Sequence, residues 1–125
     1  MSEIPEQLSY TAEHEWVAHG DVSTVGITAF AVEELGEIVF VELPAVGDVV
    51  VAGTPCGEIE STKAVSEIYV PMNGEITEVN DVLETSPETL GADPYGDGWL
   101  FKLKTDEGEY ALLDAAGYRS LIESH

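Results

Sequence analysis

The chain has 125 residues, of which 44% are hydrophobic, so its length and composition predict one folded domain with a buried core. Its 25 acidic and four basic residues give a formal net charge of −21, which makes nucleic acids and anionic membranes poor partners and favours basic protein surfaces. Cys56 is the only cysteine, which excludes an intramolecular disulfide and argues against a cysteine-based metal site.

The first residues, MSEIPEQLSY, resemble neither a secretory signal nor a transit peptide, so we expect a cytoplasmic protein. From Glu15 onward, short apolar or alternating runs are broken every few residues by Gly, Pro, Asn or Asp, which is typical of an antiparallel β sandwich or barrel. The expected strands cover residues 15–19, 22–27, 37–43, 49–53, 56–62, 65–71 and 74–80, with another at 99–104.

Helical signals occur at two places. Residues 29–35 should form a short inserted helix, with Thr28 as its N-cap and Gly36 as its C-cap. After an irregular loop over 81–98, packed down by its own Leu90 and Tyr95, the spacing becomes helical. One helical stripe contains Tyr110, Leu113, Gly117 and Leu121, and Asp114 is placed to cap this part of the chain.

The segment GEIESTKAVSEIYVPMNG, residues 57–74, is nearly symmetric about Lys63. A two-residue turn over Lys63 and Ala64 would place Ile59 opposite Ile68, and Glu60 opposite Glu67. Lys-Ala is a poor sequence for a tight turn, and the opposed glutamates repel each other. Because both destabilising features lie next to Lys63, they indicate a functional role for this lysine. An amine on a rigid turn can be acylated and then serve as a tether, whereas the structural alternative is an ordinary exposed lysine.

Several sequence motifs together resemble those of a known family: HEW (14–16), VGIT (25–28), LGEIVFVELPAVG (35–47), ESTKAVS (60–66), VPMNGEITEVN (70–80) and DPYGDGWLFKL (93–103). The half-motifs about the lysine resemble the biotinyl and lipoyl carrier domains, and the combination resembles the glycine cleavage H-protein family. This resemblance implies a mainly β fold of the lipoyl-domain type, a flattened barrel or sandwich of two antiparallel sheets with quasi-two-fold symmetry, one short inserted helix and C-terminal helices. We expect a single domain over 1–125, with a β core at 15–104 and a helical C-terminus at 106–125.

The resemblance also implies a function. A lipoyl group would be attached in amide linkage to Lys63, and the protein would be a non-catalytic carrier, expected to be a monomer, in glycine catabolism and one-carbon metabolism. It would shuttle an aminomethyl group from a pyridoxal-phosphate-dependent glycine decarboxylase to a tetrahydrofolate-dependent aminomethyltransferase. Electrons would pass to a dihydrolipoyl dehydrogenase that uses FAD and NAD, and a separate lipoylating enzyme would modify Lys63.

The resemblance also points to two acidic site residues, because Glu15 and Glu67 occupy positions where the family carries acids near the docked arm. A separate hypothesis rests on position alone: Glu60, three residues before Lys63 on the adjoining strand, would with its neighbour Glu58 help the lipoylating enzyme recognise the hairpin. Glu34 stands where some members have histidine, so no imidazole role is carried over. His14 and His19 lack a third ligand in register, and no metal site is expected.

Alternatives remain open from the sequence. A biotin carrier would have the same fold, but biotin acceptors typically flank the lysine with methionines, whereas here the neighbours are Thr62 and Ala64. A lipoyl domain of a 2-oxoacid dehydrogenase is disfavoured because no linker or catalytic domain is present, and a true enzyme because no catalytic motif is. A related lipoate carrier or relay outside a complete glycine system is not distinguished by sequence.

Overall fold

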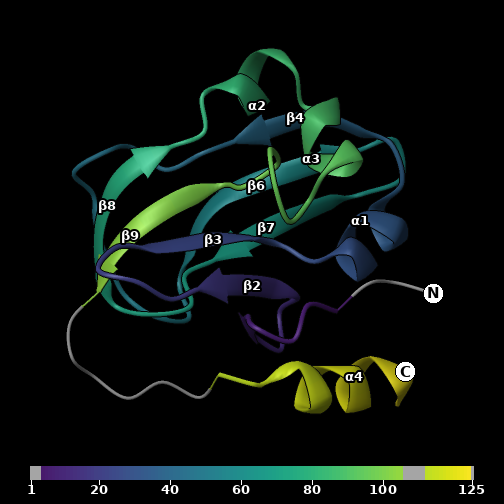
Figure 1. Cartoon of the computed structure of the whole chain (residues 1–125). Helices are drawn as coiled ribbons and strands as arrows, with labels where there is room; N and C mark the ends of the chain where they lie inside the picture. Colours follow the sequence, from purple (N-terminus) through teal and green to yellow (C-terminus); the bar gives the residue numbers. More distant parts are fainter. Residues whose placement is uncertain (1–3, 106–111, 125) are drawn as a thin grey trace.

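The computed structural model describes residues 4–105 and 112–124, and in these residues most of the chain is β structure (Figure 1). Two antiparallel sheets pack as a sandwich and do not close into a barrel. The mainly β, two-sheet fold predicted from the sequence is therefore confirmed. The strands are β1 (Ser9–Tyr10), β2 (Glu15–Ala18), β3 (Ser23–Ile27), β4 (Ile38–Glu42), β5 (Val49–Val50), β6 (Pro55–Ser61), β7 (Val65–Tyr69), β8 (Gly74–Val79) and β9 (Phe101–Thr105).

The larger sheet has the strand order β1-β2-β3-β9-β8-β5, and the smaller sheet has the order β4-β6-β7. Each expected strand is present, although the run at 49–53 is reduced to Val49–Val50. β1 was not predicted, because its two residues show no alternating pattern in the sequence. β1 is held by reciprocal backbone hydrogen bonds between Tyr10 and Leu113, both 2.7 Å long, which no local signal predicts.

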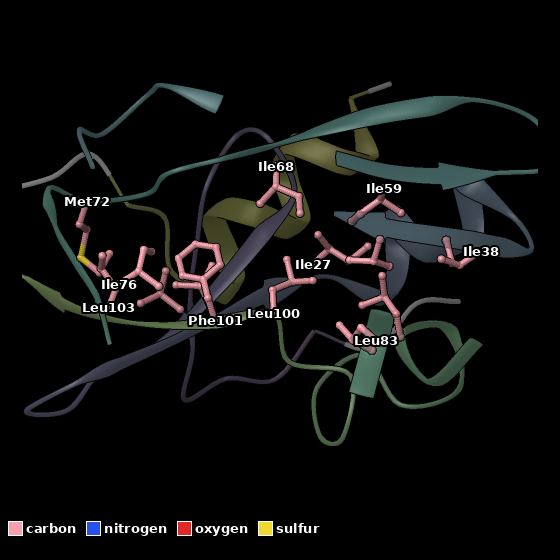
Figure 2. Packing of buried hydrophobic residues seen from close by; sticks show 14 residues of the cluster. Ile27, Ile38, Ile59, Ile68, Met72, Ile76, Leu83, Leu100, Phe101 and Leu103 are labelled. Atoms are coloured by element: carbon pink, nitrogen blue, oxygen red, sulfur yellow. The ribbon is translucent and has the colours of Figure 1, made fainter. Parts of the chain in front are cut away.

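The main core lies between the two sheets (Figure 2). Its buried side chains come from alternating positions of the strands, as expected for strands that have one face toward the core and one toward solvent. Members from both sheets and from the connecting segments are Val17, Val25, Ile27, Ile38, Val41, Ile59, Ile68, Met72, Ile76, Leu83, Leu90, Leu100, Phe101 and Leu103.

Helix α1 (Ala29–Leu35) and its caps confirm the prediction. The Thr28 hydroxyl accepts a hydrogen bond from the Ala31 N–H at 3.2 Å, and the Gly36 N–H donates to the Val32 carbonyl. Gly36 has φ +82°, a left-handed conformation that glycine adopts at low cost.

The long connection after β8 corrects one expectation. It contains two short helices, α2 (Val82–Thr85) and α3 (Glu88–Ala92), rather than only irregular loop. Each helix inserts one fully buried leucine into the core, Leu83 from α2 and Leu90 from α3. These helices are too short to show a helical period in sequence, and tertiary burial of the leucines stabilises them.

Helix α4 (Ala115–Glu123) begins at the predicted cap, where the Asp114 carboxylate accepts from the Gly117 N–H at 2.7 Å. The remaining part of the expected C-terminal helical region, residues 106–111 with Tyr110, and His125 lie outside the described residues. The domain limits stay a prediction. None of the described helices is long and apolar enough to cross a membrane, and the cytoplasmic location also stays a prediction.

The HEW and DPYGDGW segments, 78 residues apart, meet at Trp16. Its indole N–H donates to the Pro94 carbonyl at 2.9 Å, and its ring lies over Gly26 of β3. A Cβ at Gly26 would come within 2.6 Å of the indole ring, so a glycine is required there. The Tyr95 hydroxyl in turn accepts from the Ala29 N–H at 3.1 Å, which fixes the start of α1.

Candidate functional site

Lys63 lies at the exposed tip of the β6–β7 hairpin, in a turn organised by one serine. The Ser61 hydroxyl accepts from the backbone N–H groups of Lys63 and Ala64, at 3.2 and 3.1 Å. The Ser61 N–H donates to the Ala64 carbonyl at 2.8 Å, and the Thr62 N–H donates to the Glu37 carbonyl at 3.0 Å. The turn is thus anchored both to itself and to the chain just before β4.

The observed hairpin register corrects the predicted one. The two-residue turn is formed by Thr62 and Lys63 rather than Lys63 and Ala64, so each residue pairs with a partner two positions earlier than expected: Glu58 with Glu67, Ile59 with Ser66 and Glu60 with Val65. A shift of two residues keeps every side chain on its predicted face, which is why Ile59 and Ile68 remain buried.

The turn does not need the positive φ angles that had made Lys-Ala a poor choice. Among the described non-glycine residues only His14 has a positive φ, so Thr62 and Lys63 both adopt negative values. The hydrogen bonds of Ser61 take over the role that Asn-Gly or Asp-Gly plays in other tight turns.

The Lys63 side chain extends along the end of α1. A Cβ on Gly36 would lie 3.3 Å from Lys63 Cε, so the missing side chain at Gly36 leaves room for the lysine stem. Residues 4–105 and 112–124 contain one ion pair, between Lys102 and Glu78, with a nitrogen–oxygen distance of 3.7 Å. None of the described carboxylates forms an ion pair with Lys63. The amine is therefore available for a covalent substituent.

A cavity of about 270 Å³ lies beside this hairpin, between α1 and the turn that precedes β2. Figure 1 shows α1 at the same end of the sandwich as the tip between β6 and β7. Apolar side chains form much of its wall, and several carboxylates open onto it. The lining residues are Glu13, His14, Glu15, Ile27, Phe30, Ala31, Glu34, Leu35, Ile59, Ser66 and Glu67.

Glu15, on β2, is buried in the wall of this cavity and only 1% exposed. Its carboxylate accepts from the Thr11 hydroxyl at 3.0 Å and from the Tyr69 N–H at 2.9 Å, so it joins the larger sheet to the outer edge of β7. Burial raises the pKa of Glu15 to about 8, and these two hydrogen bonds only partly oppose the rise. Glu15 is therefore not part of the solvated acidic surface.

Glu67 lines the same cavity from β7 but is exposed. Its charge is the main cause that raises the pKa of the Tyr69 phenol. Across the hairpin Glu67 faces Glu58, so the like-charge pair predicted between Glu60 and Glu67 is instead formed by Glu58 and Glu67.

Glu60 does not line the cavity and lies on the outer face of the smaller sheet. It pairs with Phe40 of β4 on one side and Val65 of β7 on the other, which are 44% and 60% exposed. The structure thus separates the predicted residues into two groups, with Glu15 and Glu67 at the cavity and Glu60 on a partly apolar face beside Lys63.

The contacts of the His14 ring were not predicted from the sequence. His14 Nδ1 lies 2.8 Å from the Tyr118 hydroxyl, and that hydroxyl lies 2.7 Å from the Thr28 hydroxyl. Thr28 was recognised only as a helix cap, and Tyr118 only lies in the expected C-terminal helix. No sequence signal joins residues 90 and 104 positions apart.

The other singled-out residues have structural roles. His19 Nε2 is hydrogen-bonded to the Ser9 hydroxyl at 2.8 Å, and no group of three or more His, Cys, Asp or Glu among the described residues is placed to hold a metal. Cys56 is half-buried against the main core, and burial raises the pKa of its thiol to about 12.

Comparison with known proteins gives matches over nearly the full chain. The family model described as "Glycine cleavage H-protein" matches residues 8–125. A glycine cleavage system H protein from Rubrobacter xylanophilus is 55% identical over 124 residues, and one from Pectobacterium carotovorum subsp. carotovorum is 53% identical over 127 residues. Each of these matches covers 98% of both chains. A crystal structure of a glycine cleavage system H protein from Mycobacterium marinum has 46% identity and a TM-score of 0.91, covering 96% of this chain and 99% of that chain.

The two-sheet sandwich and the lysine on an anchored hairpin tip beside a cavity are the features of a carrier domain. The chain belongs to the glycine cleavage H-protein family. It is a lipoyl carrier of the glycine cleavage system and works with the other enzymes of that system.

Proposed function

We propose that Lys63 carries the lipoyl group in amide linkage and that the protein presents this arm in turn to the enzymes of the system. The observation that supports this assignment is the exposed Lys63 amine on a turn anchored by Ser61 and by the Glu37 carbonyl. A rigid base keeps the arm close to the protein surface, so that the tethered group has a high effective concentration at a docked partner.

The residues around Lys63 suit a lipoyl group. The stem has room above Gly36, and the nearby cavity offers apolar walls from Phe30, Leu35 and Ile59 for an aliphatic chain and its dithiolane ring. When bound, the lipoyl group supplies the sulfur chemistry that accepts an aminomethyl group and, afterwards, the dithiol that is reoxidised. The protein's part is to bind, orient and shelter this arm.

Glu15 and Glu67 are the two carboxyl groups that we assign to arm docking. An aminomethyl group carries an amine, and a nearby positive charge lowers the pKa of a carboxyl group. The pKa of Glu15, about 8 in the present structure, would therefore fall as a cation enters the cavity, and Glu15 would give up its proton and become a counter-ion. Exposed Glu67 would attract the cation at the cavity's outer side.

We assign the outer face around Glu60 to recognition by the lipoylating enzyme. Glu60 is flanked by exposed Phe40 and Val65 and lies close to the turn in sequence, so a partner that reaches Lys63 along this face would contact an acidic group between two apolar ones. The expected partners remain glycine decarboxylase, aminomethyltransferase and dihydrolipoyl dehydrogenase. The chain itself would be a non-catalytic monomer with a net charge of −21 that favours basic docking surfaces.

Mass spectrometry tests the attachment. Protein from the native host should contain a lipoyl amide on the peptide that includes Lys63, and Lys63→Arg should lack it. A biotin mass at Lys63 would identify a biotin carrier instead, and an unmodified Lys63 in lipoate-competent cells would overturn the assignment.

Reconstitution tests the role. Lipoylated protein should support glycine decarboxylation with purified partner enzymes, whereas Lys63→Arg should not. A lipoylated protein inactive with every partner would instead support the relay outside a complete glycine system. Glu60→Ala should slow lipoylation relative to the exposed control Glu75→Ala on β8, and equal rates would remove the recognition role of Glu60.

A further inference from the structure

Tyr118 links the C-terminal helix to both walls of the cavity. It is fully buried on α4, and its hydroxyl lies 2.8 Å from His14 Nδ1 and 2.7 Å from the Thr28 hydroxyl. Its ring stacks on Tyr10, with centroids 4.8 Å apart and planes 10° from parallel. Figure 1 shows α4 below β2, at the edge of the larger sheet, and the reciprocal Tyr10–Leu113 hydrogen bonds fix the segment that leads into it.

The two partners of the Tyr118 hydroxyl belong to different walls. His14 lines the cavity directly, in the turn before β2, and its ring lies 5.1 Å from the Phe30 ring of the opposite wall. Thr28 is the N-cap of α1, the helix that contributes Phe30, Ala31, Glu34 and Leu35 to the lining. The phenol oxygen thus bridges the turn and the start of the helix, in addition to the backbone hydrogen bond from the Thr28 N–H to the His14 carbonyl.

The Tyr118 hydroxyl can satisfy both of its hydrogen bonds, one as donor and one as acceptor. Burial raises the pKa of Tyr118 to about 12, so the phenol keeps its proton near neutral pH and has one bond to donate. It donates to one neighbour and accepts from the other, and the Thr28 oxygen still accepts the Ala31 N–H of the cap. Removal of the phenol oxygen would disturb His14 and Thr28 together, because both side chains are hydrogen-bonded to that one atom.

His14 is also held in an uncommon backbone conformation. Its φ of +69° makes it the one described non-glycine residue in the left-handed region, and it immediately precedes Glu15. Such a conformation persists when surrounding contacts hold it. The Tyr118 bond and the bond from the Thr28 N–H to the His14 carbonyl, at 3.0 Å, are two of those contacts.

We propose that Tyr118 is a positioning residue for the cargo-bearing arm, because its hydroxyl holds the His14 turn and the N-terminus of α1 in the arrangement that encloses the cavity. This inference rests on the arm docking proposed above. The C-terminal helix α4 then helps to hold the cavity walls that protect the arm from water, although none of its residues lines the cavity.

The consequence concerns loss of cargo to water. An aminomethyl thioether hydrolyses when its carbon–sulfur and carbon–nitrogen bonds break: R–S–CH2–NH3⁺ and water give R–SH, formaldehyde and NH4⁺. No oxidant or reductant is consumed. A cavity with loosened walls admits water more often, so the rate of ammonium release from the isolated loaded carrier reports how well the walls are held.

Tyr118→Phe is the direct test, with Tyr10→Phe as its matched control. Both changes remove one hydroxyl from the same stacked pair, but the Tyr10 hydroxyl donates to the Pro5 carbonyl, whereas the Tyr118 hydroxyl is bonded to His14 and Thr28. We expect Tyr118→Phe to release ammonium about 3- to 10-fold faster than the unaltered protein, the effect of losing a hydrogen bond of ordinary strength. Tyr10→Phe should stay within about twofold, since its hydrogen bond lies elsewhere.

A second readout uses the unmodified chain. Nitrogen-15 NMR of the His14 ring should show a changed Nδ1 signal in Tyr118→Phe and an unchanged one in Tyr10→Phe, because the Tyr118 hydroxyl is hydrogen-bonded to that nitrogen and the Tyr10 hydroxyl is bonded to Pro5. Equal ammonium release from the two tyrosine variants would overturn the inference. An unmodified Lys63 would instead contradict the proposed function, while the NMR result would still report on the link between Tyr118 and His14.

A pair of variants at His14 keeps the test valid if Tyr118→Phe does not fold. Asparagine places a polar atom where His14 has Nδ1 and tolerates the left-handed backbone, whereas alanine does neither. His14→Asn should therefore retain the cargo longer than His14→Ala. Equal loss from these two variants would count against a role for the Tyr118 hydrogen bond.

Discussion

Replacing Glu15 with glutamine should remove a pH dependence of folding stability that this one side chain creates. The ordinary pKa of the group is 4.5, and burial raises it to about 8 in the folded protein. Between these two values the folded state keeps a proton that the unfolded state has lost. The free energy of unfolding therefore falls as pH rises, by about 1.4 kcal/mol per pH unit.

The change accumulates to about 3 kcal/mol between about pH 5 and about pH 7.5. Well below pH 4.5 the group is protonated in both states, so its contribution no longer changes with pH. Glutamine is neutral throughout, and its amide oxygen can accept from the Tyr69 N–H while its amino group faces Thr11. The variant should keep the link between the sheets without the titration.

Urea unfolding at several pH values, in constant high salt to screen the net charge, measures this effect. The stability of Glu15→Gln relative to the unaltered protein should improve steadily across the pH range, by about 3 kcal/mol in total. Glu75→Gln, an exposed carboxylate on β8, controls for the loss of one carboxylate. A pH-independent difference between Glu15→Gln and the unaltered protein would refute the reasoning, since it would mean that Glu15 is ionised in the folded state throughout.

Three further substitutions test the packing and the turn. Gly26→Ala should cost about 1–3 kcal/mol in urea unfolding, because its Cβ would lie 2.6 Å from the Trp16 ring, and unchanged stability would show that β2 and β3 adjust freely. Leu90→Ala should cost about 2–5 kcal/mol and lower Tm, since this side chain is fully buried, and a loss near zero would mean that α3 does not anchor the core. Ser61→Ala should cost about 1 kcal/mol and slow lipoylation of Lys63, whereas Thr62→Ala keeps its backbone bond to Glu37 and should not. Equal lipoylation rates for these last two variants would show that the turn need not be organised by Ser61.

Local patterns in the sequence were enough to predict strands β2 to β9, the capped helix at 29–35 and the cap at Asp114. These features depend on neighbours within a few residues, where alternation, capping side chains and glycine conformations act. The same reasoning placed Lys63 in the hairpin turn, and the family resemblance then gave its expected chemistry. By contrast, α2 and α3 were missed, because burial of Leu83 and Leu90 stabilises them rather than any local signal.

The tertiary structure decided what depends on distant partners. The predicted hairpin register was wrong by two residues, because the Ser61 hydroxyl organises the turn over Thr62 and Lys63. Rules for cross-strand pairs do not include such a hydrogen bond. Glu15 could be named from sequence, but only the packing of β2 against the edge of β7 shows that it is buried and holds a proton near neutral pH. Tyr118 reaches the cavity walls through contacts that span 90 and 104 residues, and such contacts form only when the whole chain has folded.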